Sequence, residues 1–163
     1  FPTNLKRNTN ACNYAGMPYI SNCDFDGVES MLTHILPNQL KNDRVMNWAE
    51  YGKIIEFDQE GPRSMDPKGF VYVPDTCVNG GCRLHVAFHG CSQSVSYLNE
   101  DYIQNTGYLE WAAANDLIVL FPQTIKTKVN ENGCWDFWGY TGNTYATKDG
   151  EQPKAIMDMV HKL

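Results

Sequence analysis

The 163-residue sequence has no long apolar run and no excess of positive charge. No stretch approaches the roughly 18 to 20 consecutive apolar residues that a membrane-spanning helix needs. The net charge of −6 and the pI near 5.1 argue against a general affinity for phosphate backbones or anionic lipids, because both require clustered lysine and arginine. We therefore expect neither a nucleic acid nor a membrane as a partner.

Histidine is scarce, with four residues, whereas cysteine is present six times. The even number of cysteines, their two close local pairs and the scarcity of histidine favour disulfides over metal ligands. Short loops cost the least entropy to close, so the nearest cysteines are expected to pair first. The expected disulfides are Cys12–Cys23, Cys77–Cys82 and Cys91–Cys134. They indicate an oxidising, extracellular compartment.

The length and the 42% hydrophobic content fit one globular domain. The asparagine-rich segment 1–25 contains two cysteines and is predicted to be an ordered loop without helix or strand. Apolar residues then recur at helical spacing between Val28 and Leu36, which predicts an amphipathic helix. Asp24 fits the N-cap of that helix, and Pro37 fits its end.

Four apolar runs have the length of β-strands. The runs 52–59 and 68–74 are β-branched and aromatic and are separated by glycine and proline, which favours an antiparallel pair. The runs 83–90 and 117–123 are almost wholly apolar, so both are predicted to be parallel strands buried on both faces. These strands predict an α/β fold.

Two more helices are expected in the second half of the chain. One covers residues 107–116, between the two buried strands, and supplies the crossover that parallel strands need. The other covers residues 152–163, where Ile156, Met159 and Val160 share one face and Pro153 lies near the start.

The ends of the two buried strands are the first candidate site, because ligands bind beyond the carboxyl ends of the strands in α/β sheets. His89, Gly90 and Cys91 follow one strand, and Pro122 and Gln123 follow the other. Gly90 permits close approach, so a backbone N–H here could bind a developing oxyanion. The alternative is that His89 only satisfies backbone groups at the strand end.

Metal binding is disfavoured by the spacing of the histidines. His85 and His89 share one face of a strand, but they lie about 13 Å apart, which is too far for one zinc ion. The acidic run "CDFDG" lacks the spaced ligands and terminal glutamate of a calcium-binding EF-hand loop. We therefore expect no metal.

The run "NENGCWDFWGYTG", residues 130–142, carries four aromatic residues around one cysteine. These residues are Trp135, Phe137, Trp138 and Tyr140. Exposed aromatics in such a loop suit an apolar or polymeric ligand, whereas buried ones would cover the edge of the sheet. Both interpretations remain open, and Tyr97 and Tyr102 are weaker candidates of the same kind.

Four motifs in order along the chain together resemble those of the extracellular polyhydroxybutyrate (PHB) depolymerases. They are "YISNCDFDG", "CRLHVAFHGCSQS", "IQNTGYLEWAAANDLIVLFPQT" and "NGCWDFWGYTG". The resemblance covers nearly the whole chain and implies a serine esterase with an α/β-hydrolase fold that needs no cofactor. The sequence lacks the G-x-S-x-G turn that carries the serine nucleophile in such folds.

The "YISNCDFDG" block ahead of "HVAFHGC" is similar to the circularly permuted branch of that family, in which the nucleophile precedes the oxyanion strand. Residues 1–163 are therefore expected to form one partial domain, the C-terminal part of the catalytic domain. The resemblance implies that the Cys91 N–H is an oxyanion donor and that His89 and Gly90 shape its turn. It also implies that Asn132, Trp135 and Phe137 line the substrate crevice, with Phe137 at a position where the family commonly has tryptophan.

Three hypotheses for function follow. In the leading hypothesis, the chain is part of a secreted serine esterase that acts on a polyester or another ester. The Ser-His-Asp triad is then supplied by an N-terminal half or by a second chain. The second is a non-catalytic secreted binding or structural protein on the same scaffold. The third is an intracellular metal protein, which requires reduced cysteine thiols.

Overall fold

A four-stranded sheet forms the centre of the computed structural model, which describes all residues 1–163. Its strands are β4 (Gly52–Asp58), β5 (Lys68–Pro74), β6 (Arg83–Val86) and β7 (Leu117–Phe121), in the order β4-β5-β7-β6. β4 with β5 and β5 with β7 are antiparallel, whereas β6 and β7 are parallel. The predicted antiparallel pair, parallel pair and α/β class are therefore confirmed.

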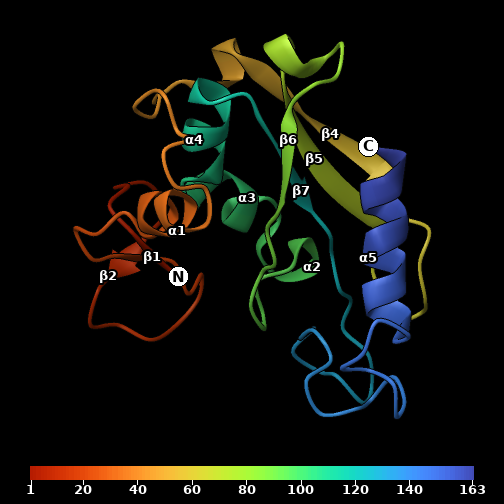
Figure 1. Ribbon diagram of the computed structural model, residues 1–163. Coiled ribbons are helices and arrows are strands. Elements are labelled where there is room, and N and C mark those ends of the chain that lie inside the picture. Colours follow the sequence, from red (N-terminus) through yellow and green to blue (C-terminus); the bar gives the residue numbers. More distant parts are fainter.

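Helices cover both faces of the sheet (Figure 1). α1 (Gly27–Ile35), α3 (Asp101–Asn105) and α4 (Tyr108–Ala114) lie on one side, and α5 (Glu151–Lys162) lies on the other. A short helix α2 (Val95–Leu98) follows β6, and two 3-10 turns, η1 (Trp48–Glu50) and η2 (Asp75–Cys77), flank the antiparallel pair. No helix combines the length and the hydropathy that a bilayer span requires.

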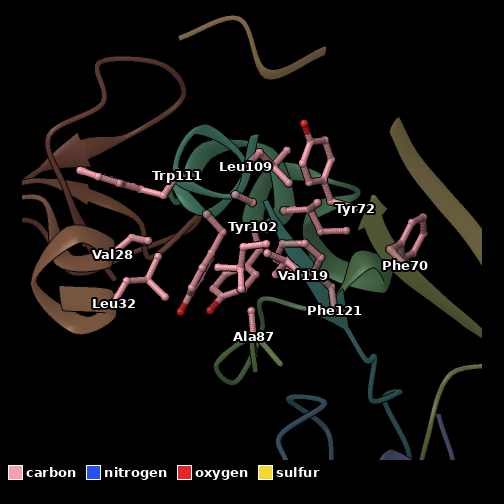
Figure 2. Close-up of a cluster of buried hydrophobic side chains, with 14 residues drawn as sticks. Val28, Leu32, Phe70, Tyr72, Ala87, Tyr102, Leu109, Trp111, Val119 and Phe121 are labelled. Carbon is pink, nitrogen blue, oxygen red and sulfur yellow. The ribbon is translucent and has the colours of Figure 1, made fainter. Parts of the chain in front are cut away.

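The larger hydrophobic core lies between the sheet and the helices α1, α3 and α4. Figure 2 shows Val28 and Leu32 from α1 on one side of this core and sheet residues such as Tyr72 and Phe121 on the other. Each fully buried side chain of this size stabilises the fold by about 1.5 to 3 kcal/mol relative to an exposed one. A second cluster of five residues, Met65, Val71, Leu120, Ala155 and Met159, joins the other face of the sheet to α5.

β6 differs from its sequence-based expectation. The apolar run 83–90 predicts a strand buried on both faces, but the strand ends at Val86 and all four of its residues are only half-buried. The physical reason is that β6 is the edge strand, with β7 on one side and no strand on the other. β7 lies inside the sheet, and it is buried as expected.

The N-terminal segment contains strands that the sequence did not indicate. β1 (Pro2–Thr3), β2 (Asn10–Ala11) and β3 (Ser21–Asn22) form a small parallel sheet in the order β1-β3-β2. The prediction of a loop without strands was wrong, because pairing partners far apart in sequence decide two-residue strands. The three expected disulfides are confirmed, so no thiol is free and the metal-protein hypothesis loses its ligands.

The N-cap of α1 is also different from the one expected. Asp26, not Asp24, caps the helix, with its Oδ1 accepting the N–H of Glu29 at 3.0 Å. Its other oxygen accepts hydrogen bonds from Arg44 at 2.6 Å and from Trp111 Nε1 at 3.0 Å. Asp26 therefore ties α1 to α4 as well as capping it.

Candidate functional site

The turn after β6, residues 88–94, is the centre of the candidate site. It leaves the carboxyl end of β6 and leads into α2, at the same end of the molecule as the loops between β7 and α5 (Figure 1). The sequence places His89, Gly90 and Cys91 in this turn, and the structure confirms that they lie at the strand end. Each of the three has a different environment.

His89 is buried and holds the turn with both ring nitrogens. Its Nδ1 lies 2.8 Å from the carbonyl oxygen of Gly90, and its Nε2 accepts the N–H of Thr124 at 3.2 Å. Because Nε2 is an acceptor, the proton is on Nδ1 and is donated to Gly90. Burial lowers the pKa of His89 to about 4, although the bond to Gly90 acts in the opposite direction. The ring is therefore neutral at pH 7 and has no free nitrogen for acid-base chemistry.

The backbone N–H of Cys91 makes no hydrogen bond within the protein. In a trans peptide the carbonyl and the next N–H point in opposite directions. The Gly90 carbonyl is held by His89 and by the N–H of Gln93 at 3.2 Å, so the Cys91 N–H points away from both. Cys91 is exposed. The turn thus presents an unpaired donor at the carboxyl end of a parallel strand.

Ser92 joins this turn to the run of residues 130–142, which we call the aromatic loop. Its φ of +57° is in the left-handed region, where a non-glycine residue carries roughly 1 kcal/mol of strain. Its N–H donates to the carbonyl of Asn132 at 2.7 Å, and the neighbouring Cys91–Cys134 disulfide links the same two segments. The structure therefore places Asn132 beside the turn.

Ser92 is not placed to be a nucleophile activated by histidine. Its hydroxyl lies 3.5 Å from Oδ1 of Asn132, and no hydrogen bond joins any serine side chain to a histidine. The one hydroxyl near a histidine ring is that of Thr124, which is fully buried and donates to the Gly133 carbonyl. The chain contains no Ser-His pair with the geometry that acyl transfer requires.

Of the aromatic residues in the loop 130–142, some pack against the protein and others are exposed to solvent. Trp135 is half-buried, packs on the rings of Phe88 and His89, and donates its Nε1–H to the His89 carbonyl at 3.1 Å. Phe137 is 69% exposed and lies edge-to-face with Trp138, with ring centroids 4.7 Å apart. Trp135 therefore supports the turn, while Phe137 and Trp138 present an aromatic surface to solvent.

Asp136 organises this loop. Its carboxylate accepts the backbone N–H groups of residues 138–141 and the hydroxyl of Thr141. Burial alone would raise the pKa of Asp136, but these hydrogen bonds lower it below its usual value. These hydrogen bonds consequently hold the backbone that carries Phe137 and Trp138 in one conformation.

An apolar groove of about 480 Å³ begins beside the turn and continues along α5. It is lined by Phe88, Trp135, Asp136, Tyr145, Gln152, Pro153, Ile156 and Met157. Grooves of this size and polarity accept small apolar ligands or one segment of a polymer.

The weaker candidates, Tyr97 and Tyr102, make hydrogen bonds that support the backbone around the turn and the aromatic loop. Tyr102 is buried and donates its hydroxyl to the Phe88 carbonyl at 2.8 Å, and the Tyr97 hydroxyl donates to the Glu131 carbonyl. Pro122 and Gln123 are buried, and Gln123 accepts the N–H of Val95 at the start of α2. Sequence reasoning missed Gln93, whose side chain accepts the N–H of Gly90. Glutamine is not among the short polar residues typical of such local bonds, so no local signal indicates it.

Comparison with curated proteins gives two related enzymes, while no family model matches the chain. The chain is 39% identical over 161 residues to a poly(3-hydroxybutyrate) depolymerase of Delftia acidovorans, covering 94% of this chain and 32% of that protein. It is 36% identical over an alignment of 181 residues to a polyhydroxybutyrate depolymerase of Talaromyces funiculosus, covering 100% of this chain and 52% of that protein.

Two solved structures match the whole chain. One is the PHB depolymerase from Penicillium funiculosum, with a TM-score of 0.93 and 37% identity, and the match covers 100% of this chain and 56% of that one. The other is a PHB depolymerase complexed with an R3HB trimer, with the same TM-score, identity and coverage. The comparisons confirm the resemblance that the four motifs indicate. The chain spans about half of these structures and of the Talaromyces protein, and a third of the Delftia protein.

Proposed function

Because this chain is related to the polyhydroxybutyrate depolymerases along its whole length, we propose that it forms the oxyanion-bearing part of a secreted serine esterase of that kind. In this proposal residues 1–163 are one partial domain of a circularly permuted α/β-hydrolase. The serine, histidine and aspartate of the triad lie in sequence outside this chain. The three disulfides support secretion, because such bonds persist in oxidising compartments.

The unpaired N–H of Cys91 is the observation that carries the proposal. When an activated serine attacks an ester carbonyl, the carbonyl oxygen becomes an oxyanion that needs hydrogen-bond donors. The Cys91 N–H is such a donor, and its direction is fixed before the reaction because His89 holds the same peptide by its carbonyl. A preorganised donor of this kind contributes about 10² to 10³ in kcat.

The groove and the aromatic loop support a polyester as the substrate. An aliphatic polyester alternates apolar segments with ester groups that accept hydrogen bonds but carry no charge. The groove beside the turn is largely apolar, and Asn132 lies at the turn as a polar group. We propose that Asn132, Trp135 and Phe137 line the crevice that receives the polymer segment next to the Cys91 N–H.

The edge of β6 supports completion of the sheet by the part that carries the triad. Leu84 and Val86 are apolar but only half-buried, and the outer edge of β6 lacks a partner strand. Parallel strands are normally covered on both faces, and an exposed edge strand presents unpaired backbone N–H and C=O groups that can pair with another strand. A further strand beside β6 would bury these residues and bring its own carboxyl end, where a nucleophile would sit, next to the Cys91 turn.

Hydrolysis by the natural protein at full length tests the proposal. We expect it to cleave a short p-nitrophenyl ester and a PHB film, and we expect residues 1–163 alone to cleave neither. Hydrolysis by the isolated chain would contradict the assignment of the nucleophile to sequence outside it. A full-length protein with three intact disulfides and a native circular dichroism spectrum, but without esterase activity, would instead support the non-catalytic hypothesis.

A further inference from the structure

Gln93 links two segments that the sequence does not connect. Its side chain is buried, with 6% of the residue exposed, and uses both ends of its amide. Oε1 accepts the N–H of Gly90 at 2.9 Å. Nε2 donates to the carbonyls of Pro18 and Tyr19, each at 3.1 Å. The amide therefore bridges the turn after β6 and the loop that the Cys12–Cys23 disulfide closes.

The loop side of this bridge is itself anchored. The N–H of Tyr19 donates to the carbonyl of Gly16 at 2.7 Å, within the same loop. The carbonyl of the next residue, Ile20, accepts the N–H of Asn10 at 2.8 Å, beside the small parallel sheet. Gln93 is thus attached to a fixed part of the fold rather than to a free loop.

On the turn side, Gln93 occupies the space that a side chain at residue 90 would need. A Cβ atom at position 90 would lie 2.6 Å from Gln93 Oε1, well inside van der Waals contact, and apart from its two chain neighbours the only atoms within 4 Å of it belong to Gln93. Gly90 and Gln93 therefore form a matched pair. The lack of a side chain at residue 90 is what lets the amide oxygen reach the backbone.

Gly90 is the residue whose backbone would otherwise be freest, because glycine has no Cβ to restrict its dihedral angles. Two buried side chains remove that freedom from opposite sides. Gln93 holds the peptide before the Gly90 Cα by its N–H, and His89 holds the peptide after it by its carbonyl. Together they fix the orientation of the peptide whose other end is the Cys91 N–H.

We propose that Gln93 is a positioning residue of the esterase, which holds Gly90 against the Cys12–Cys23 loop and thereby aims the Cys91 N–H at the oxyanion. This inference rests on the proposed function, since it names the residue that orients the donor. Gln93 does not touch the substrate, so its effect belongs to kcat. A misplacement of the donor by about 1 Å can cost roughly 10²-fold in rate.

Steady-state kinetics of the natural protein at full length test this role. We expect Gln93→Ala to lower kcat for a p-nitrophenyl ester by about 10- to 100-fold, with KM changed by less than about two-fold. Gln93→Glu keeps an oxygen opposite the Gly90 N–H, so it should recover part of the lost kcat. An unchanged kcat in Gln93→Ala, or a loss confined to KM, would overturn the inference.

A double-mutant cycle tests the matched pair directly. Gly90→Ala should also lower kcat, because the new Cβ displaces the Gln93 amide. In Gly90→Ala with Gln93→Ala that contact no longer exists, so the double variant should lose no more than the worse single variant. Multiplicative losses would mean that the two residues act independently, which contradicts the inference.

Asn115 provides a matched structural control. It is a buried amide residue that bridges two segments through Lys41, Asn42 and Trp111, and it precedes β7 at the opposite end of the strands from the turn. Asn115→Ala should lower the stability of the protein about as much as Gln93→Ala does, with kcat within two-fold of the wild type. If both variants lower kcat equally, Gln93 acts only through stability and the positioning role is wrong.

Amide hydrogen exchange separates this inference from the proposed function. The Gly90 amide should exchange faster in Gln93→Ala than in the wild-type and Asn115→Ala proteins, whether or not the protein hydrolyses esters. Wild-type exchange at Gly90 in Gln93→Ala would overturn the inference while leaving esterase activity intact. Absence of hydrolysis by the wild-type protein would instead overturn the proposed function.

Discussion

His89 illustrates how the fold decides the role of a single residue. In the sequence it stands beside a glycine and a cysteine at a strand end, where it either belongs to a catalytic turn or only satisfies backbone groups. In the structure its ring is buried, neutral and bonded through both nitrogens to the backbone of Gly90 and Thr124. The group that remains available for chemistry is the backbone N–H of the residue two positions later.

The depressed pKa of His89 makes stability depend on pH. The unfolded state binds a proton near pH 6.5, whereas the folded state binds it only near pH 4. The contribution is therefore fully present above pH 6.5 and is lost as the pH falls toward 4, with a total of roughly 3 kcal/mol. We expect the free energy of unfolding to fall over this window in the wild-type protein and to fall less in His89→Gln. Urea unfolding at pH 7.5, 5.5 and 4.5 measures the difference, and parallel curves for the two proteins would contradict it.

At the scale of elements, the helix α1 shows how a terminus is chosen between two neighbouring aspartates. Both Asp24 and Asp26 precede the apolar periodicity, and both are good N-cap residues. The tertiary structure selects Asp26, because Arg44 and Trp111 approach it from other elements. Asp24 has a φ of +50° and lies outside the helix.

Substitution of the two aspartates distinguishes them. Asp26→Ala removes the cap and leaves the Arg44 and Trp111 donors without their acceptor, so we expect a loss of about 2 to 4 kcal/mol in the free energy of unfolding. Asp24→Ala, the matched control, should change it by less than about 0.5 kcal/mol. Chemical denaturation of both variants provides the measurement. A larger loss of unfolding free energy in Asp24→Ala than in Asp26→Ala would show that Asp24 is the N-cap of α1.

At the scale of the whole molecule, two of the disulfides differ in their distance from the candidate site and in the segments that they link. Cys77–Cys82 links two cysteines five positions apart, just before β6 and at the far end of that strand from the candidate site. Cys91–Cys134 spans 43 residues and joins the turn after β6 to the aromatic loop. Loss of the longer link should therefore affect both stability and chemistry.

Removal of each disulfide in the full-length protein tests this distinction. The loop-entropy relation gives about 4 kcal/mol for the Cys91–Cys134 link and about 2 kcal/mol for Cys77–Cys82. We expect Cys91→Ala with Cys134→Ala to lower both the unfolding free energy and kcat, because Asn132 and the turn separate. Cys77→Ala with Cys82→Ala should lower stability alone. Equal kcat values in the two variants would show that the link to the aromatic loop does not position the donor.

Much of the architecture is predictable from local patterns, and the failures have a common cause. The antiparallel pair, the buried strand β7, the helices α1, α4 and α5 and all three disulfides follow from periodicity and spacing. The short strands of the N-terminal sheet and the half-buried state of β6 do not, because they depend on which strands lie alongside. At the site, the sequence indicates Cys91, His89 and Gly90 as candidates but does not indicate Gln93, since its partners Pro18 and Tyr19 lie more than 70 residues away.

The sequence by itself determined the α/β class, the disulfide pairing and the resemblance to PHB depolymerases, because short-range periodicity, loop entropy and ordered motifs are properties of the chain. Only the tertiary structure decided that the histidine at the strand end is a neutral support and that the Cys91 N–H is the free donor. The reason is that the direction of a peptide group depends on which side chains hold it. Those side chains, His89 and Gln93, are themselves bonded to backbone groups of Thr124 and Pro18, in segments that meet the turn only in the folded protein.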